Sequence, residues 1–227
     1  MGSHTQVEQG LAKLVVRAKW ARGVLLAYLL AVALTVPISA SVTLMVSTFG
    51  LSPDYVALFL TGCLISGLAL FIGQAITIPL WIYRAWANLH AMGLQGLEYS
   101  PGWAASSIFV PIAGLIVPFR AMRQLANRSF GEEEYHANAS VADVTSWWAC
   151  YLGGIFVQLA MLGIAIFNSI GWVNNRLMVI TAPEPVRLLT AAFGIALMLG
   201  AAWFLRKVIG EITAAQTSFT GIEDTFA

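Results

Sequence analysis

Charged side chains are scarce in this chain. Of its 227 residues only 10% are Asp, Glu, Lys or Arg, whereas 59% are hydrophobic and the mean hydropathy is +0.78. A soluble domain of this size has about 25% charged residues. The deficit excludes an ordinary soluble fold and indicates that lipid is the solvent over much of the surface. The net charge of +1, without a basic stripe, gives no indication of nucleic-acid binding.

Cysteine and histidine are scarce as well. Cys63 and Cys150 lie in apolar runs, where we expect small hydrophobic side chains, and no CxxC motif or Cys/His cluster predicts a metal site. The long apolar runs contain no histidine pair for a membrane haem and no carboxylate for proton transfer or hydrolysis. The sequence therefore predicts no metal and no cofactor.

Four apolar stretches are long enough to cross a membrane. They cover residues 23–48, 55–83, 147–172 and 186–205, and the first is a run of 26 residues without a charge. As a helix it would be about 39 Å long, against roughly 30 Å of hydrocarbon core. A secretory signal is an alternative for this stretch, although the apolar run continues past Ser39-Ala40-Ser41, where cleavage would fall. We predict a single all-α integral membrane domain over residues 1–227 with four transmembrane helices.

A shorter apolar segment lies between the second and third stretches. Residues 103–117 are too few for the roughly 20 that a spanning helix needs, and Pro111 interrupts them. We expect a re-entrant or interfacial segment here, covering residues 103–128 in all. Near both ends of the chain, hydrophobic residues at helical spacing predict short amphipathic helices on the membrane surface, from Val7 to Ala18 and from Val208 to Ile222.

The basic residues predict the orientation. If residues 103–117 do not cross, ten of the twelve Lys and Arg residues lie on one side of the membrane; if they cross, the division is seven against five. Because positive charge is retained on the cytoplasmic side, the first arrangement is favoured. We therefore predict a multi-pass protein of the cytoplasmic (inner) membrane with both termini in the cytoplasm. The ten inner residues would be Lys13, Arg17, Lys19, Arg22, Arg84, Arg120, Arg123, Arg128, Arg206 and Lys207.

Polar side chains gather at the predicted inner interface. Arg84 and Asn88 are one helical turn apart, and Trp81 lies one turn before Arg84. Arg120 and Arg123 follow the segment that must return the chain to the same layer. Guanidinium groups bind phosphate and carboxylate bidentately, so we predict that these five residues bind an anionic lipid headgroup or a partner carboxylate. The alternative is a structural role, in which the arginines extend to lipid phosphates beside a broken segment.

The ends of the second and fourth stretches share a pattern. Trp81-x-x-Arg84 and Trp203-x-x-Arg206 both place a tryptophan one turn before an arginine. The two halves could be distant repeats in the same orientation. Interfacial tryptophans and inner arginines at any cytoplasmic helix end explain the same pattern.

Several motifs in the middle of the chain resemble those of a known family. They are Trp81–Asn88, Tyr99–Trp103, Val110–Ala113 and Pro118–Arg123, with Trp147-Trp148 and Ile212–Gln216 further along. Together they resemble the bacterial membrane family catalogued as domain of unknown function 4328, over most of residues 23–216. The resemblance implies a four-span bacterial membrane protein and transfers no activity.

The sequence departs from the family pattern at three positions. Gly114 stands where the family pattern PIANL has asparagine, Val117 replaces a basic residue, and Gln124 replaces an acidic one. The resemblance therefore implies a charge pair and a polar tip that this chain lacks.

Three classes of function fit these observations. We favour a non-catalytic membrane module that binds membrane lipids, through anionic headgroups, or docks a protein partner at its cytoplasmic face. A small transporter or channel with residues 103–117 as a re-entrant gate is a second hypothesis, although few polar positions line the spans. A lipid-interface enzyme is a third, in which Arg84 would hold the substrate charge without a visible nucleophile or base. The sequence leaves the oligomeric state open.

Overall fold

The computed structural model describes residues 2–50, 52–131, 139–169 and 182–223. Every regular element in these ranges is a helix, and none of the ranges contains a strand. Four helices are long: α1 (Gly2–Phe49), α2 (Pro53–Ala91), α5 (Ala139–Ser169) and α6 (Glu184–Glu223). Between α2 and α5 lie α3 (Pro101–Ser106), the 3₁₀ turns η1 (Ser107–Phe109) and η2 (Ala113–Leu115), and α4 (Val117–Ser129).

The four long helices are all long and apolar enough to cross a membrane. This confirms the predicted all-α fold with four candidate spanning helices. Each helix extends beyond its apolar stretch: at 1.5 Å per residue the 39 residues of α2 measure about 58 Å, roughly twice a hydrocarbon core. The end of the predicted third stretch, residues 170–172, and the acidic run 132–134 lie outside the described residues.

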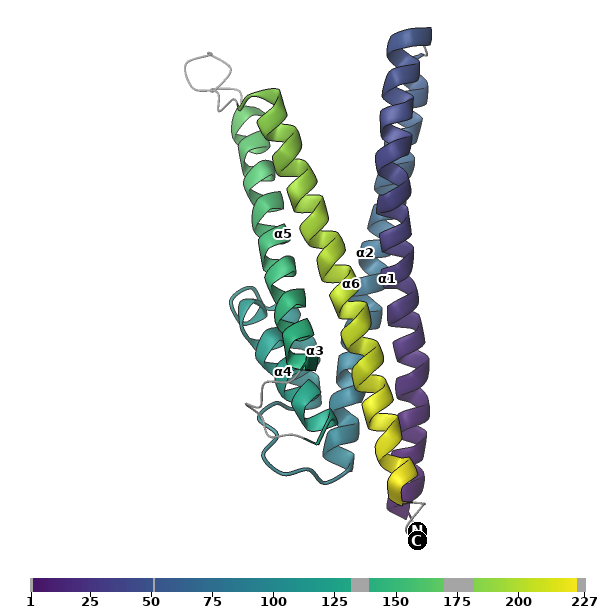
Figure 1. Ribbon diagram of the computed structural model, residues 1–227, viewed down its shortest axis with the longest axis vertical. Coiled ribbons are helices and arrows are strands. Elements are labelled where there is room, and N and C mark those ends of the chain that lie inside the picture. Colours follow the sequence, from purple (N-terminus) through teal and green to yellow (C-terminus); the bar gives the residue numbers. More distant parts are fainter. Residues whose placement is uncertain (1, 51, 132–138, 170–181, 224–227) are drawn as a thin grey trace.

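The long helices form two hairpins, α1 with α2 and α5 with α6 (Figure 1). The hairpins lie apart at the end where α1 and α5 finish and α2 and α6 begin. They meet at the opposite end, where α1 begins, α6 finishes and α3 and α4 pack; we call this end the base. The most apolar 18-residue windows of α1 and α2 contain no buried residue, so the buried core of the protein lies in the base.

The two ends of the described chain are helical, as predicted, but they are not separate helices. α1 runs without a break from Gly2 through the first apolar stretch, and α6 continues to Glu223. Leu11, Leu14 and Ala18 of α1 and Val208, Ile209 and Ile212 of α6 are buried in the base, whereas Val15 is 47% exposed. These segments differ from the predicted surface helices because each apolar stripe packs on neighbouring helices instead of on lipid.

Local signals set several helix ends. The Ser52 side chain accepts a hydrogen bond from the Asp54 N–H at 3.2 Å and begins α2, with Pro53 at the first helical position. Both α2 and α4 end just before a glycine in the left-handed region, Gly93 with φ 74° and Gly131 with φ 75°. This conformation is accessible to glycine at little cost and stops the helix.

The Pro-interrupted segment forms a tight fold-back instead of a long helix. Ser100 caps α3 by accepting a hydrogen bond from the Trp103 N–H at 3.3 Å. After the two 3₁₀ turns the chain reverses into α4, which packs on α5. The tip of the fold-back carries apolar side chains, of which Ile112 is 80% exposed. Insertion of this tip into the membrane stays a prediction.

Candidate functional site

A buried polar cluster joins three helices in the base. Gln216 of α6 is fully buried, and its amide nitrogen donates to the Ala85 carbonyl of α2 at 3.2 Å and to the Ser129 hydroxyl of α4 at 2.9 Å. Its amide oxygen accepts a hydrogen bond from the buried Asn88 side chain at 3.4 Å. Because buried amides are stable only when hydrogen-bonded, this cluster fixes α6 against α2 and α4.

Trp81 and Arg84 are held by contacts from two neighbouring helices. Trp81 is fully buried, and its indole N–H donates to the Thr213 hydroxyl of α6 at 3.1 Å. Arg84 donates from Nε to the Gly10 carbonyl of α1 at 3.0 Å. A Cβ at Gly10 would overlap Nη2 of Arg84 and lie 2.6 Å from the side-chain oxygen of Asn88. The glycine therefore lets α1 approach α2 at the level of Arg84.

A second arginine lies close to Arg84. Arg17 of α1 donates to the carbonyl of Leu80, one turn before Arg84 on α2, at 2.8 Å. The positive charge of Arg17 acts on Arg84, and no described carboxylate is among the groups that act on it. Two arginines thus bond across the α1–α2 contact near the end of the charge-free stretch 55–83.

The other two predicted ligands lie on α4. Arg120 is exposed and lies beside Tyr99 and Glu98, not beside Arg84. Burial raises the pKa of Tyr99, and the charge and hydrogen bond of Glu98 raise it further, whereas Arg120 lowers it, so the phenol is neutral at physiological pH. Arg123 is half-buried, and its Nε has no hydrogen-bond partner among the described residues.

The structure thus brings three of the five predicted site residues together, namely Trp81, Arg84 and Asn88. No contact within the described ranges joins the arginines of α4 to this group. The described contacts of all three are with the protein itself. The headgroup-binding role of the five residues stays a prediction.

Gln124 holds the loop of residues 92–100 against α4. Its amide oxygen accepts a hydrogen bond from the Glu98 N–H at 3.2 Å, and its amide nitrogen donates to the Gly96 carbonyl at 3.2 Å. A carboxylate at this position would have no hydrogen to donate and would make only the first contact. Gln124 therefore has a structural role that an acidic side chain would fulfil only in part.

A groove lies between α1 and α6 in the base. It has two adjoining lobes of about 420 and 460 Å³, and Arg22, Arg206, Gly210 and Ala214 line both. The guanidinium of Arg22 lies against α6, because a Cβ added at Gly210 would be 3.3 Å from its Cζ. We call this feature the α1/α6 groove.

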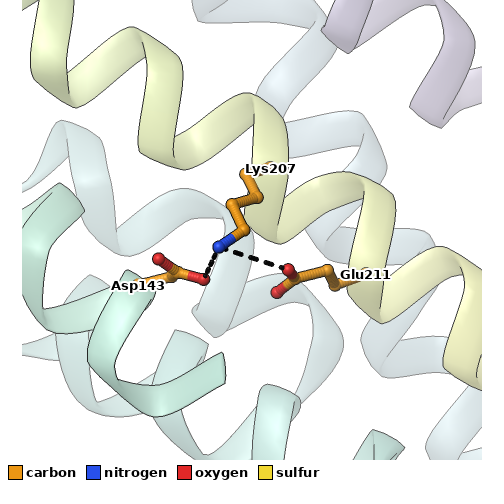
Figure 2. A network of polar contacts seen from close by, with 3 residues as sticks. All are labelled: Asp143, Lys207 and Glu211. Atoms are coloured by element: carbon orange, nitrogen blue, oxygen red, sulfur yellow. Dashed lines mark ion pairs between the residues drawn. The ribbon is translucent and has the colours of Figure 1, made fainter. Parts of the chain in front are cut away.

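The two lobes differ in charge. Lys207 and Glu211 line the first, whereas the second is lined by Lys19 and by no carboxylate. Figure 2 shows Lys207 between Asp143 of α5 and Glu211, with Nζ–O distances of 2.7 and 3.7 Å. The charge of Lys207 is thereby compensated. Lys19 has no ion-pair partner among the residues that the structure describes, and the same is true of the two arginines of the groove.

The sequence analysis used Arg22 to orient the chain and Arg206 for the orientation and the Trp-x-x-Arg pattern, and it did not predict the groove that they line. The Trp203-x-x-Arg206 pattern is the signal that points to it, since both residues line the first lobe. Trp203 is 58% exposed, whereas Trp81 in the matching motif is buried. The two motifs therefore occupy different environments.

The four apolar helices, joined by a core in the base, define the class: a multi-pass α-helical membrane protein. Within the described ranges no three His, Cys, Asp or Glu side chains are grouped as a metal site requires. Residues 56–210 match the model of the domain of unknown function DUF4328, and the chain belongs to this family. No curated protein and no solved structure matches the chain.

Proposed function

We propose that this protein is a non-catalytic membrane module that binds anionic lipid headgroups at the cytoplasmic face of the membrane. The base would face the cytoplasm, since ten of the twelve Lys and Arg residues then lie on that side. The observation that carries the proposal is that Arg17 and Arg84 both bond to backbone carbonyls at the α1–α2 contact, at 2.8 and 3.0 Å, and that neither has an ion-pair partner among the described residues.

The pair has free donors for a phosphate group. Arg84 uses Nε, and Arg17 uses Nη1, for a backbone carbonyl. A guanidinium has five N–H donors, so each side chain retains others for a phosphate oxygen. A phosphate between the two groups would also relieve the repulsion between like charges.

The remaining predicted residues take separate parts in this proposal. Trp81 and Asn88 would position Arg84 and would not touch the headgroup, because both are buried. Arg120 and Arg123 would meet the same membrane surface from α4. Proton-coupled transport has less support, because it needs a carboxylate or histidine within the spans and the apolar stretches contain neither.

Native mass spectrometry of the full chain tests the proposal, in micelles that contain equal amounts of phosphatidylglycerol and phosphatidylcholine. We expect the wild type to retain phosphatidylglycerol, and Arg17→Gln to bind it about 5-fold more weakly, since one basic residue near the surface contributes about 1 kcal/mol. Arg187→Gln is the matched control, because Arg187 is exposed near the start of α6. Equal retention by all three proteins would contradict the proposal.

A further inference from the structure

We infer a second anion site, in the α1/α6 groove, where Lys19, Arg22 and Arg206 bind the phosphate of a lipid headgroup. It lies on the α6 side of α1, whereas the Arg17/Arg84 pair lies at the contact of α1 with α2. The groove site therefore goes beyond the proposed function and stands on residues of its own.

Uncompensated charge is the first observation that carries this inference. Three cationic side chains line the second lobe, and no carboxylate does. Nε of Arg206 is buried without a hydrogen-bond partner among the described residues. A buried guanidinium donor without a partner is costly, and a phosphate oxygen is the acceptor that its geometry suits best.

The carboxylates beside the groove do not compensate the cations of the second lobe. Lys207 is held by Asp143 and Glu211, so its two carboxylate partners are already engaged (Figure 2). Neither carboxylate forms an ion pair with Arg22 or Arg206. The cations of the second lobe are thus left for a ligand.

Space for a phosphate comes from the backbone of α6. Gly210 presents no side chain to the groove, and the Arg22 guanidinium lies against it. The lobe of about 460 Å³ opens beside this contact. A larger residue at position 210 would displace the guanidinium into that space.

The level of the groove identifies the source of the phosphate as a lipid. Arg22 comes directly before the charge-free stretch 23–48, and Arg206 comes directly after the charge-free residues 188–205. On the membrane side of the arginines the groove is lined by the apolar residues Leu26 and Trp203, which are 40% and 58% exposed. Acyl chains would cover this apolar wall, and basic pockets between spanning helices at the cytoplasmic side suit anionic lipid headgroups.

The test compares the full chain with Arg22→Gln/Arg206→Gln in micelles that contain phosphatidylglycerol and phosphatidylcholine, read by native mass spectrometry. We expect the double variant to retain one phosphatidylglycerol fewer than the wild type, with binding at this site about 30-fold weaker. Arg187→Gln is the control at the other end of α6 and should bind as the wild type does. If the double variant retains as much phosphatidylglycerol as this control, the groove site is refuted.

Two further measurements keep the outcome clear. Lys19→Gln changes an exposed side chain without a described partner, so it tests the site even if the double variant fails to fold. Binding of phosphatidylglycerol that is about 5-fold weaker supports the site, and unchanged binding refutes it. Added inorganic phosphate should not displace phosphatidylglycerol from the site. If it does displace the lipid, the assignment of the site to a lipid headgroup is overturned. If Arg17→Gln loses phosphatidylglycerol while the groove variants retain it fully, the groove site is refuted and the proposed function stands.

Discussion

Replacing Gln216 by methionine should loosen α6 from the rest of the base. Methionine has nearly the length and volume of glutamine, so the packing is retained while the hydrogen bonds are lost. Those bonds run to the Ala85 carbonyl, to the Ser129 hydroxyl and from the Asn88 amide. Because Gln216 is 0% exposed, water does not take their place.

The magnitude depends on which partners lose their bonds. The Ala85 carbonyl lies inside α2 and keeps its helical hydrogen bond, but Asn88 and Ser129 are buried and lose a partner each. A buried polar group without a partner costs about 1–3 kcal/mol, and the gain from burying a thioether offsets a part of that sum. We expect the free energy of unfolding to fall by about 2–4 kcal/mol.

Equilibrium unfolding in mixed micelles measures this change through tryptophan fluorescence, because Trp81, Trp86 and Trp147 are buried in the base. The control is Gln9→Met, the same substitution at an exposed position of α1. An exposed substitution of this kind should change the free energy of unfolding by less than about 0.5 kcal/mol.

A double variant sharpens the test. Asn88→Leu/Gln216→Met removes both amides, so no unpaired donor remains between α2 and α6, and its loss of stability should be smaller than the sum of the single losses by about 1 kcal/mol. Additive losses would show that the two amides do not interact. If Gln216→Met unfolds together with the wild type and Gln9→Met, the polar cluster does not hold α6.

Three further predictions concern the base and the orientation. Gly10→Ala should lower the free energy of unfolding by about 1 kcal/mol, because the added Cβ would overlap the guanidinium of Arg84. Gly23→Ala is the control: a Cβ there has nothing within 4 Å, so the substitution should raise the free energy of unfolding by up to about 1 kcal/mol. Equal effects of the two substitutions would contradict the close contact at Gly10. Gln124→Glu should speed proteolysis of the loop 92–100, since a carboxylate has no hydrogen for the loop carbonyl, and an unchanged rate would show that this bond is dispensable. In a cysteine-free background, Gln95→Cys should react with an impermeant maleimide only in inside-out vesicles and Glu184→Cys only in right-side-out vesicles; the reverse would refute the proposed orientation.

The sequence was sufficient to predict the four candidate spanning helices. Membrane partition depends on composition summed over about 20 residues, so single positions matter little, and the four apolar stretches were visible without tertiary information. The family was visible too, because motifs such as Tyr99–Trp103 and Pro118–Arg123 lie within the matched residues 56–210.

The position of the core was not predictable in this way. A stripe such as Leu11, Leu14 and Ala18 has the same helical period whether lipid or another helix covers it. In this protein the stripe is buried in the base, and the expected surface helices are the ends of α1 and α6. Composition identifies an apolar face, but the partner of that face depends on contacts distant in sequence.

The candidate site was predictable only in part, for the same reason. Spacing along one helix placed Trp81, Arg84 and Asn88 together, and the structure agrees. Their partners Gly10 and Gln216 come from the two ends of the chain, and no local pattern links them. Arg22 and its neighbour Gly210 of α6 are far apart in the sequence. The distribution of charge along the sequence therefore indicated the side of the membrane on which Arg22 lies, but not its contact with α6.

Stability of the base and lipid binding should depend on each other. Few residues are buried in the apolar windows, so the base core sets the relative positions of α1, α2 and α6 and hence of the arginine pairs that they carry. A ligand that binds only the folded state adds about 2.7 kcal/mol at 100 times its dissociation constant, similar to the loss expected for Gln216→Met. Phosphatidylglycerol should therefore restore the unfolding free energy of this variant in micelles, and phosphatidylcholine should not. Equal effects of the two lipids on the unfolding free energy would mean that the arginines recognise no headgroup charge. If phosphatidylglycerol still stabilises Arg17→Gln and Arg22→Gln/Arg206→Gln, it binds at other residues.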